Sequence, residues 1–326
     1  MLAVGENGAG KTNLLEALHV GTQGFSPRTR NDAQLVRFGA EAGRIELAGK
    51  RGGTALEIEI TLRPRDAKKA VLNGASLRAA EQLRTEVATL VFTPDRLVVV
   101  KGGPAARRAY FDRALGRLFP ARAGLAAEYA AAVAQRNAAL RRVVVGASSR
   151  DAVGPWTQRV AELGEQLVGA RSEAISELGA PFAERASELD LPRAELVYEA
   201  EAPTAEALEG RLAEDLERGT TGLGPHLDEI EIRADGRDLR RFGSQGEQRL
   251  AVLSLLLAEA ELLASRSPVR PLLLLDDVLS ELDERRRRAL AERLSGGGQT
   301  LITATGAGAL PVEPAQLVSV RPGSAE

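Results

Sequence analysis

Apolar and polar positions follow two different periods along this chain, and the change from one period to the other divides it into three parts. In the first part every second residue from 56 to 62 is apolar, which predicts a half-buried antiparallel strand. Short apolar stretches at 2–4 and 88–92 predict two further strands, and Asn73-Gly74 predicts a hairpin turn. Residues 1–119 therefore favour an α/β structure.

In the middle part, residues 120–216, apolar residues recur every three or four positions, which is typical of amphipathic helices. The most regular stripe runs from Trp156 to Leu178, directly after Gly154-Pro155, and predicts a helix of a bundle or short coiled coil. We expect residues 120–216 to form a separate all-helical lobe. The lobe is too short to be a long coiled-coil arm.

Strand patterns return in residues 217–326. Asp235-Gly236 predicts a hairpin, 247–264 predicts a long apolar helix, and Leu272–Leu275 predicts a buried strand. A helix over 285–294 and a core strand over 299–305 complete this part. The tail after Pro311 contains proline and glycine, so we expect it to be loosely ordered.

Composition narrows the class of protein. The chain has no cysteine, which excludes disulfides and thiolate sites and fits a reducing cytoplasm. No apolar run is long enough to span a membrane, so we expect a cytoplasmic protein without a membrane part. The net charge is −2, so any binding of nucleic acid must depend on a local basic patch rather than on the whole surface.

The N-terminal glycine-rich segment, GENGAGKT, fits the phosphate-loop pattern G-x-x-x-x-G-K-[ST]. Glycines let backbone N–H groups surround a phosphate, Lys11 supplies a positive charge to the β- and γ-phosphates, and the Thr12 hydroxyl can bind Mg²⁺. We therefore expect ATP to contact eight consecutive residues: Gly5, Glu6, Asn7, Gly8, Ala9, Gly10, Lys11 and Thr12.

Two carboxylates end the buried strand Leu272–Leu275, which is the Walker B pattern. We expect Asp276 to hold Mg²⁺ together with Thr12, and Asp277 to polarise the water that attacks the γ-phosphate. Asp277 and Lys11 are thus the expected catalytic residues, and ATP and Mg²⁺ the expected cofactors. Lys11 and Asp276 stand near opposite ends of the chain, so a helical lobe must interrupt one ATPase core, as in ABC and SMC-type heads.

The segment Ser244-Gln245-Gly246-Glu247-Gln248 precedes the long apolar helix. Its simplest interpretation is a helix-capping box formed by the serine and the glutamate. It also has the S-x-G-x-Q form of an ABC signature, in which the Ser244 hydroxyl and the Gly246 N–H would contact the γ-phosphate held by a second subunit. We expect Ser244, Gly246 and Gln248 to bind the nucleotide. ATP would then join two copies into a homodimer. Residues 280–283 resemble the D-loop of such dimers.

Several segments of the chain resemble the RecF family. They are SPRTRNDAQLVRFG at 26–39, FTPDRLVVVKGGPAARRAYFD at 92–112, Gly-Pro-His at 224–226 followed by Asp228, and LLLLDDVLSELD at 272–283. The resemblance covers nearly the whole chain. It implies a P-loop ABC/SMC-type ATPase head with an inserted helical lobe, single-stranded DNA binding at gaps and duplex junctions, and ATP-driven dimerisation with slow, DNA-dependent hydrolysis that acts as a switch.

The resemblance also implies a role in DNA replication and recombinational repair. RecR and RecO are the implied partners, and the implied outcome is the loading of RecA at gaps and the SOS response. The chain departs from the family pattern in three places. First, RecF-like chains carry strands before the phosphate loop, and we expect a misassigned start codon or a fragment to explain why this sequence has only Met1–Val4 there. Second, Leu227 stands where an arginine is usual. Third, Glu247 replaces a more usual glutamine.

For DNA phosphates we expect contacts from Lys101, Arg107 and Arg108, because they lie in the most family-specific segment. Arg240-Arg241 and Arg285–Arg288 are weaker candidates, since runs of charge are often solvated helix faces. Aromatic residues make up only 3% of the chain, which favours recognition of the DNA backbone over base stacking.

Two alternatives from other protein classes are open at this stage. A transporter ATPase subunit would normally carry a histidine where this chain has Thr303 and Thr305, and it would lack the segment 92–112. A structural SMC-like head that tethers DNA with little ATP turnover is disfavoured by the short helical lobe.

Overall fold

The computed structural model describes all residues from Met1 to Glu326, and they form two compact units. The first unit consists of Met1–Arg96, Glu188–Asp190 and Val252–Glu326, and the second of Leu97–Ser187 and Leu191–Ala251. No helix combines the length and the apolar character that crossing a membrane requires.

The boundaries of the second unit differ from those of the predicted lobe. We expected an all-helical lobe over residues 120–216, but the unit begins at Leu97 and continues to Ala251. It also contains a three-stranded antiparallel sheet of β7 (Ala194–Val197), β8 (Glu231–Ala234) and β9 (Arg237–Asp238). The spacing of apolar residues within 120–216 could not predict these boundaries, because the core of the unit includes Leu115, which precedes the lobe. Its sheet also contains strands that follow the lobe.

A six-stranded sheet is the centre of the first unit. Its strands lie in the order β13 (Ser324–Ala325), β12 (Leu317–Arg321), β1 (Leu2–Val4), β11 (Thr300–Ala304), β10 (Leu272–Leu275) and β6 (Thr89–Phe92). All neighbours are parallel except β12 and β13. Strand β10 is an unbroken run of leucine, as expected for a parallel strand covered on both faces.

The tail after Pro311, which we expected to be loosely ordered, contributes a strand to this sheet. Strand β12 pairs in parallel with β1, placing Leu2 opposite Leu317 and Val4 opposite Ser319. Val320 is buried in the same apolar cluster as Ala3 and Leu15. The prediction was wrong because it weighed the prolines and glycines that flank the strand above its own apolar residues.

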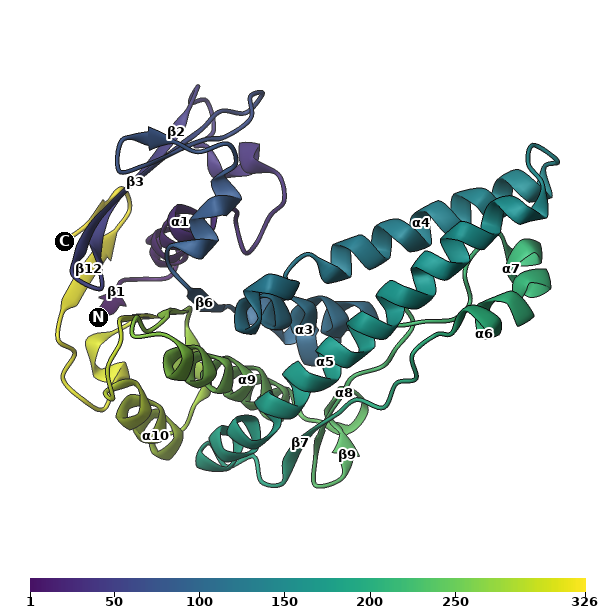
Figure 1. Cartoon of the computed structure of the whole chain (residues 1–326). Helices are drawn as coiled ribbons and strands as arrows, with labels where there is room; N and C mark the ends of the chain where they lie inside the picture. Colours follow the sequence, from purple (N-terminus) through teal and green to yellow (C-terminus); the bar gives the residue numbers. More distant parts are fainter. The chain divides into compact units, whose positions relative to one another are not determined.

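An antiparallel sheet packs on the first helix of the same unit (Figure 1). Helix α1 (Lys11–Gln23) faces β2 (Gly43–Arg51) and β3 (Thr54–Leu62), and β4 (Lys69–Leu72) and β5 (Ala75–Ser76) complete the sheet. The predicted hairpin is confirmed, since Asn73 and Gly74 both adopt positive φ, at 47° and 81°. A Cβ on Gly21 would lie 2.2 Å from Leu47 Cδ1, so glycine permits the close approach of helix and sheet.

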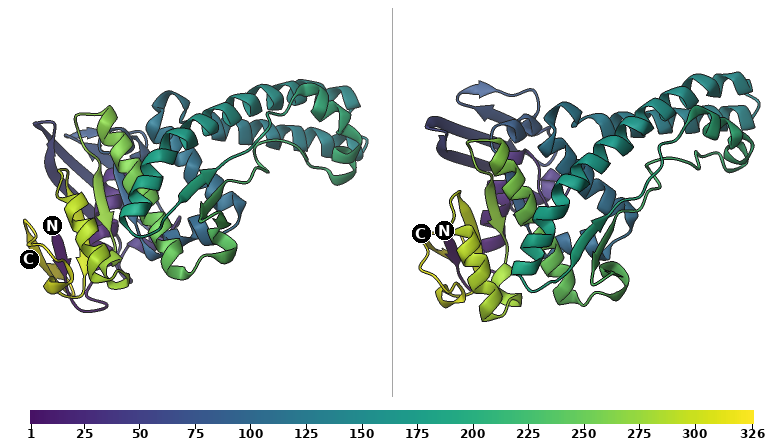
Figure 2. Two further views of the ribbon diagram at one scale, coloured as in Figure 1. Left: turned by 90° about the horizontal axis from the view of Figure 1, so that it is seen from below. Right: turned by 60° about the horizontal axis from the view of Figure 1, so that its bottom comes forward.

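In the second unit, two long helices lie side by side in all three views (Figures 1 and 2). They are α4 (Leu125–Val144) and α5 (Gly154–Glu188), and their shared core contains Tyr129, Val133 and Leu163. The remaining helices of the unit are α2 (Val98–Lys101), α3 (Pro104–Leu118), α6 (Ala205–Gly210), α7 (Leu212–Arg218) and α8 (Leu239–Phe242). The long helix α9 (Gln245–Arg266) begins in this unit and ends in the first. The last helix, α10 (Glu284–Leu294), belongs to the first unit.

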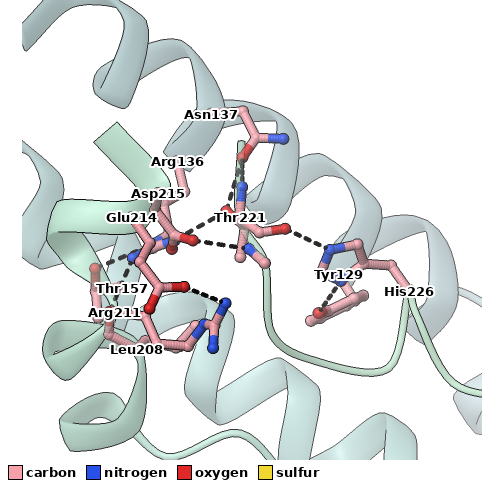
Figure 3. Close-up of polar contacts among 11 residues, drawn as sticks. Tyr129, Arg136, Asn137, Thr157, Leu208, Arg211, Glu214, Asp215, Thr221 and His226 are labelled. Carbon is pink, nitrogen blue, oxygen red and sulfur yellow. Dashed lines mark hydrogen bonds and ion pairs between the residues drawn. The ribbon is translucent and has the colours of Figure 1, made fainter. Parts of the chain in front are cut away.

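A fully buried arginine, Arg136 of α4, connects this helix to α6, α7 and the segment after them (Figure 3). Arg136 donates hydrogen bonds to Asp215 at 2.6 Å, to the Thr221 hydroxyl at 2.9 Å and to the Leu208 carbonyl at 3.2 Å. The Thr221 hydroxyl in turn donates to Asn137 at 2.7 Å. A buried charge is tolerated only when it is paired in this way, so the segment after α7 has one defined path.

Candidate nucleotide-binding site

The phosphate loop connects β1 to α1, as the motif predicts. Gly8 and Gly10 have φ values of 83° and 106°, in the left-handed region that side chains other than glycine rarely adopt. Glu6, Asn7 and Gly8 form the exposed crest of the loop, and Ala9 is buried beneath them. Gly5 is fixed differently, because a Cβ there would lie 2.3 Å from the carbonyl oxygen of Val320 in β12.

The Lys11 ammonium lies within the curve of this loop. It donates hydrogen bonds to the carbonyl oxygens of Gly5 at 2.8 Å and Glu6 at 2.9 Å. The side chain is therefore folded back over the loop rather than extended into solvent. Because α1 begins at Lys11, its first unpaired N–H groups face the same concavity and add partial positive charge there.

The Walker B strand brings a carboxylate to this loop. Asp276, buried at the end of β10, accepts hydrogen bonds from the Thr12 hydroxyl at 3.1 Å (Oδ1) and 3.0 Å (Oδ2). Thr303 at the end of β11 donates to Asp276 Oδ1 at 2.7 Å. Sequence reasoning noted Thr303 only as the absence of a histidine, and it missed this bond because the pairing of β10 with β11 creates it.

The second carboxylate has a different environment. Asp277 is exposed and has a φ of 49°, a conformation that costs energy for a residue with a side chain. Its backbone N–H donates to the Thr303 hydroxyl at 2.9 Å, and its carbonyl oxygen accepts from the Ser280 hydroxyl at 2.9 Å. These two bonds hold the backbone of the strained turn, so Asp277 is fixed at the strand end while its side chain is exposed to solvent.

The donor set fits Mg²⁺. Thr12 and Asp276 supply a hydroxyl and a carboxylate that already converge, and both are the oxygen ligands Mg²⁺ prefers. No group of three or more histidine, cysteine, aspartate or glutamate side chains could hold a metal by itself. Mg²⁺ that is shared with phosphates and water needs only one or two protein ligands, and Thr12 and Asp276 would supply them.

The signature segment forms the predicted capping box at the start of α9. Glu247 N–H donates to the Ser244 hydroxyl at 3.2 Å, and Ser244 N–H donates to the Glu247 carboxylate at 2.7 Å. The bond from the Ser244 backbone lowers the pKa of the Glu247 carboxyl below its usual value. Ser244 and Gly246 are exposed at the helix N-terminus, where an anion could be bound.

Gln248 has a different place from the one predicted. We expected it to contact nucleotide, but its side chain is buried and its amide donates to the Leu239 carbonyl at 2.8 Å. One turn into α9, Gln248 faces α8 instead of solvent. It therefore positions the signature turn, and only Ser244 and Gly246 of the predicted set are available to a ligand.

Comparisons with known proteins agree with these motifs. The model of the RecF/RecN/SMC N-terminal domain family matches residues 1–321. The DNA replication and repair protein RecF of Heliobacterium modesticaldum is 36% identical over 317 residues, covering 93% of this chain and 85% of the relative. RecF of Anaeromyxobacter sp. strain Fw109-5 is 40% identical over 318 residues, with the same two coverages.

The chain belongs to the RecF family. A solved structure of the recombination mediator RecF with ATP, from the RecFOR pathway, has a TM-score of 0.87 and 27% identity, covering 100% of this chain and 90% of that one. An Smc head bound to the C-winged helix domain of ScpA has a TM-score of 0.59 at 15% identity, which shows a shared fold alone. RecF membership confirms the predicted ATPase-head fold and sets aside the transporter alternative.

Two of the segments that suggested RecF in the sequence, 92–112 and 224–228, meet at one buried arginine of α5. Arg171 donates to the two carboxylate oxygens of Asp112 at 2.7 and 3.0 Å and to the Pro225 carbonyl at 2.7 Å. Its guanidinium also lies 3.8 Å from Asp228, which accepts from the Tyr198 hydroxyl at 2.6 Å. Sequence reasoning missed Arg171 and Tyr198, because neither stands in a recognisable motif.

The arginines of the RecF-like segment 92–112 make other contacts than we predicted. Arg107, expected to contact DNA, is buried, and its guanidinium donates to Glu229 and to the carbonyl oxygens of Val100 and Gly102. Arg108 is half-buried and donates to the Asp228 carbonyl, and burial lowers its pKa. Of the three candidates, only Lys101 is exposed, so Arg107 is corrected to a structural residue.

Proposed function

We propose that this chain is an ATP-dependent DNA-binding protein of replication and recombinational repair that acts at single-stranded gaps. Binding of ATP joins two copies, and slow hydrolysis, stimulated by DNA, releases them, so the ATPase works as a switch. The observation that carries the ATPase part is the meeting of Thr12 and Asp276 at 3.0–3.1 Å, which brings the two nucleotide motifs of a RecF family member into one site.

Each residue of the site has a chemical task in this proposal. The loop N–H groups from Gly5 to Gly10 and the Lys11 ammonium bind the β- and γ-phosphates. Thr12 and Asp276 hold Mg²⁺, which supplies charge neutralisation at the phosphates when bound. Asp277, exposed at the end of β10, accepts a proton from the attacking water as general base.

The dimer part of the proposal depends on the start of α9. Ser244 and Gly246 are exposed at the N-terminus of a 22-residue helix, whose unpaired N–H groups favour a negative charge. A γ-phosphate held in the site of one copy can be bound by this helix end of a second copy. Each nucleotide site would then consist of the phosphate loop and Walker B strand of one copy and the Ser244 helix end of the other. Because ATP bridges the two, dimerisation would depend on ATP.

The proposed cellular role extends the family relationship. The solved relatives are described as recombination mediators of the RecFOR pathway. By analogy we propose RecR and RecO as partners, the loading of RecA at gaps and support of the SOS response as outcomes, and the cytoplasm as location. Support comes from the similarity over nearly the whole length of chain and relatives.

The proposal is tested by binding of the purified chain to gapped and to fully duplex DNA, with and without ATP and Mg²⁺. The matched variants are Lys11→Ala, which removes phosphate binding, and Asp277→Asn, which keeps the site but removes the base. We expect ATP to increase binding to gapped DNA in the wild type and in Asp277→Asn, and to have no effect in Lys11→Ala.

Light scattering on the same three proteins checks the switch. Asp277→Asn should accumulate as an ATP-bound dimer because it cannot hydrolyse, and turnover should fall by about 10²–10⁴-fold, the usual range for a general base. ATP-independent DNA binding in the wild type would contradict the nucleotide-gated function. Equal turnover in wild type and Asp277→Asn would contradict the role of Asp277.

A further inference from the structure

The loop before β2 holds an aromatic side chain out in solvent. Phe38 is fully exposed, the most exposed large apolar residue of the chain. It lies in a tight turn closed by the Ala40 N–H, which donates to the Arg37 carbonyl at 2.9 Å, and Gly39 takes the required left-handed φ of 81°. Val36 and Ala40 pack into the core on either side. The turn therefore fixes Phe38 away from the core.

Basic residues are frequent in the two segments at this end of the antiparallel sheet. Gly43 pairs with Leu62 and Lys68 forms an ion pair with Asp32, so the segment that contains the Phe38 turn lies beside the connection from β3 to β4. Residues 26–42 and 63–69 together contain seven arginines and lysines against three acidic residues, in a chain whose net charge is −2. Arg37 and Arg65 are exposed and make no ion pair, while Lys68 is neutralised by Asp32 and Glu81.

An exposed aromatic ring framed by unpaired arginines is the usual composition of a surface that binds single-stranded nucleic acid, where the cations contact phosphates and the ring stacks on a base. A docking site for a protein would more often be a contiguous apolar patch. Here Phe38 is the only exposed large apolar side chain in residues 26–69, so it does not belong to a contiguous patch of exposed apolar side chains.

We propose that Phe38, Arg37 and Arg65 form a contact for single-stranded DNA, in which an unpaired base stacks on the Phe38 ring. The inference rests on the proposed DNA-binding function and identifies one surface that carries it. It adds to the expectation that scarce aromatics favour recognition of the DNA backbone over base stacking: one ring, held outward by its turn, is enough for one base. It also moves the basic contact from Arg107, which is buried, to a segment nearer the N-terminus.

The test is fluorescence anisotropy with gapped, single-stranded and duplex DNA at several salt concentrations, using four variants. Phe38→Ala should weaken binding to single-stranded and gapped DNA by about 5- to 100-fold, the range of one stacked base, and leave duplex binding nearly unchanged. Phe38→Trp should retain affinity, whereas Phe38→Leu, apolar but not aromatic, should behave like the alanine variant. Arg37→Ala should lower both the affinity and its dependence on salt.

The chain supplies a matched control and a direct reporter. Lys50 is exposed at the other end of the same sheet, opposite Ala55, so Lys50→Ala should leave the salt dependence unchanged. Trp156 is the only tryptophan of the chain. In Trp156→Phe combined with Phe38→Trp, emission reports on position 38 alone and should be quenched by oligo(dT) but not by duplex DNA.

The possible results separate this inference from the proposed function. If the wild type binds gapped DNA and Phe38→Ala binds equally well, the stacking contact is wrong while the proposed function stands. If Phe38→Leu keeps full affinity, the contact is apolar rather than stacked and the inference also fails. If the wild type binds no DNA in ATP and Mg²⁺, the proposed function itself fails.

Discussion

The Thr303 hydroxyl donates a 2.7 Å hydrogen bond to the carboxylate of Asp276, and the same oxygen accepts the backbone N–H of Asp277 at 2.9 Å. One buried hydroxyl thus joins the side chain of the proposed Mg²⁺ ligand to the backbone of the proposed general base. A shift of β11 relative to β10 would move both groups together. In a RecF family member this makes Thr303 a positioning residue between the two carboxylates.

Thr303→Val tests this relationship with almost no change in volume. The variant leaves the buried Asp276 carboxylate with one donor fewer, so we expect a loss of about 1–3 kcal/mol in the free energy of unfolding. The Mg²⁺ concentration needed for ATP binding should also rise. Urea denaturation and a Mg²⁺ titration measure the two effects. Thr303→Ser should restore both, and Thr305→Val, at an exposed position, should change neither.

Two glycines of helix α5 should respond in opposite directions to alanine. A Cβ at Gly164 would lie 2.5 Å from Pro203 Cγ and 3.0 Å from its Cδ, so Gly164→Ala should destabilise the second unit by about 1–3 kcal/mol. Gly169 has nothing within 4 Å, so Gly169→Ala should stabilise by up to about 1 kcal/mol. Thermal unfolding measures both, and equal shifts in melting temperature would refute the packing at Gly164.

Arg171 should matter far more to stability than another arginine of the same helix. Arg171→Ala leaves Asp112 and Asp228 largely buried without their cation, and breaking such a pair costs about 3–5 kcal/mol. Arg159 forms an exposed pair with Glu162, so Arg159→Ala should cost less than about 0.5 kcal/mol. Urea denaturation of the two variants measures this difference, and we expect a clearly lower midpoint for Arg171→Ala than for Arg159→Ala. Similar midpoints would mean that Arg171 is not buried in solution.

His226 should make stability depend on pH. Its Nε2–H donates to the Thr221 carbonyl at 3.0 Å, and Nδ1 accepts from the Tyr129 hydroxyl at 2.8 Å, so the neutral ring satisfies both partners (Figure 3). Burial lowers the pKa of His226 below 6.5, with Arg108 and Arg171 acting in the same direction and Asp228 opposing them. The unfolded chain therefore takes up a proton first as the pH falls.

The resulting contribution to stability is complete above pH 6.5 and is lost as the pH falls through 6.5 towards the lower pKa of the folded state. We expect the unfolding free energy of the wild type to decrease between pH 7 and pH 5.5. In His226→Gln, which cannot titrate, this slope should be smaller. Identical slopes in the two proteins would show that His226 does not titrate differently on folding.

The nucleotide site could be predicted from the sequence because each of its motifs is a short continuous segment. The phosphate loop needs its glycines, its lysine and its threonine next to one another, and the Walker B carboxylates follow directly after the apolar strand that positions them. The capping box at Ser244 was predictable for the same reason, since its two partners are three residues apart. Periodicity likewise indicated the long helices α5 and α9.

Contacts between distant segments could not be read from local patterns. Arg107 and Arg171 are both arginines in helices, yet both are buried because acidic partners arrive from residues 228–229 or from α3. Gln248 occupies the glutamine position of the signature motif, but its side-chain amide donates to the Leu239 carbonyl of the short helix α8 instead of facing a ligand. The strand β12 has a weak apolar pattern and becomes a strand because β1 offers an unpaired edge.

The position of β1 also sets the order in which this protein can be built. Its two neighbours in the sheet, β11 and β12, are encoded at the other end of the chain. On a ribosome the phosphate loop emerges first, but its strand stays without partners until residues 300–321 have been synthesised. Residues 97–251, which contain the whole of the second unit, emerge earlier and can fold meanwhile. A growing chain can therefore form its second unit before it can hold nucleotide, so the nucleotide site becomes complete only after residues 300–321 have joined β1.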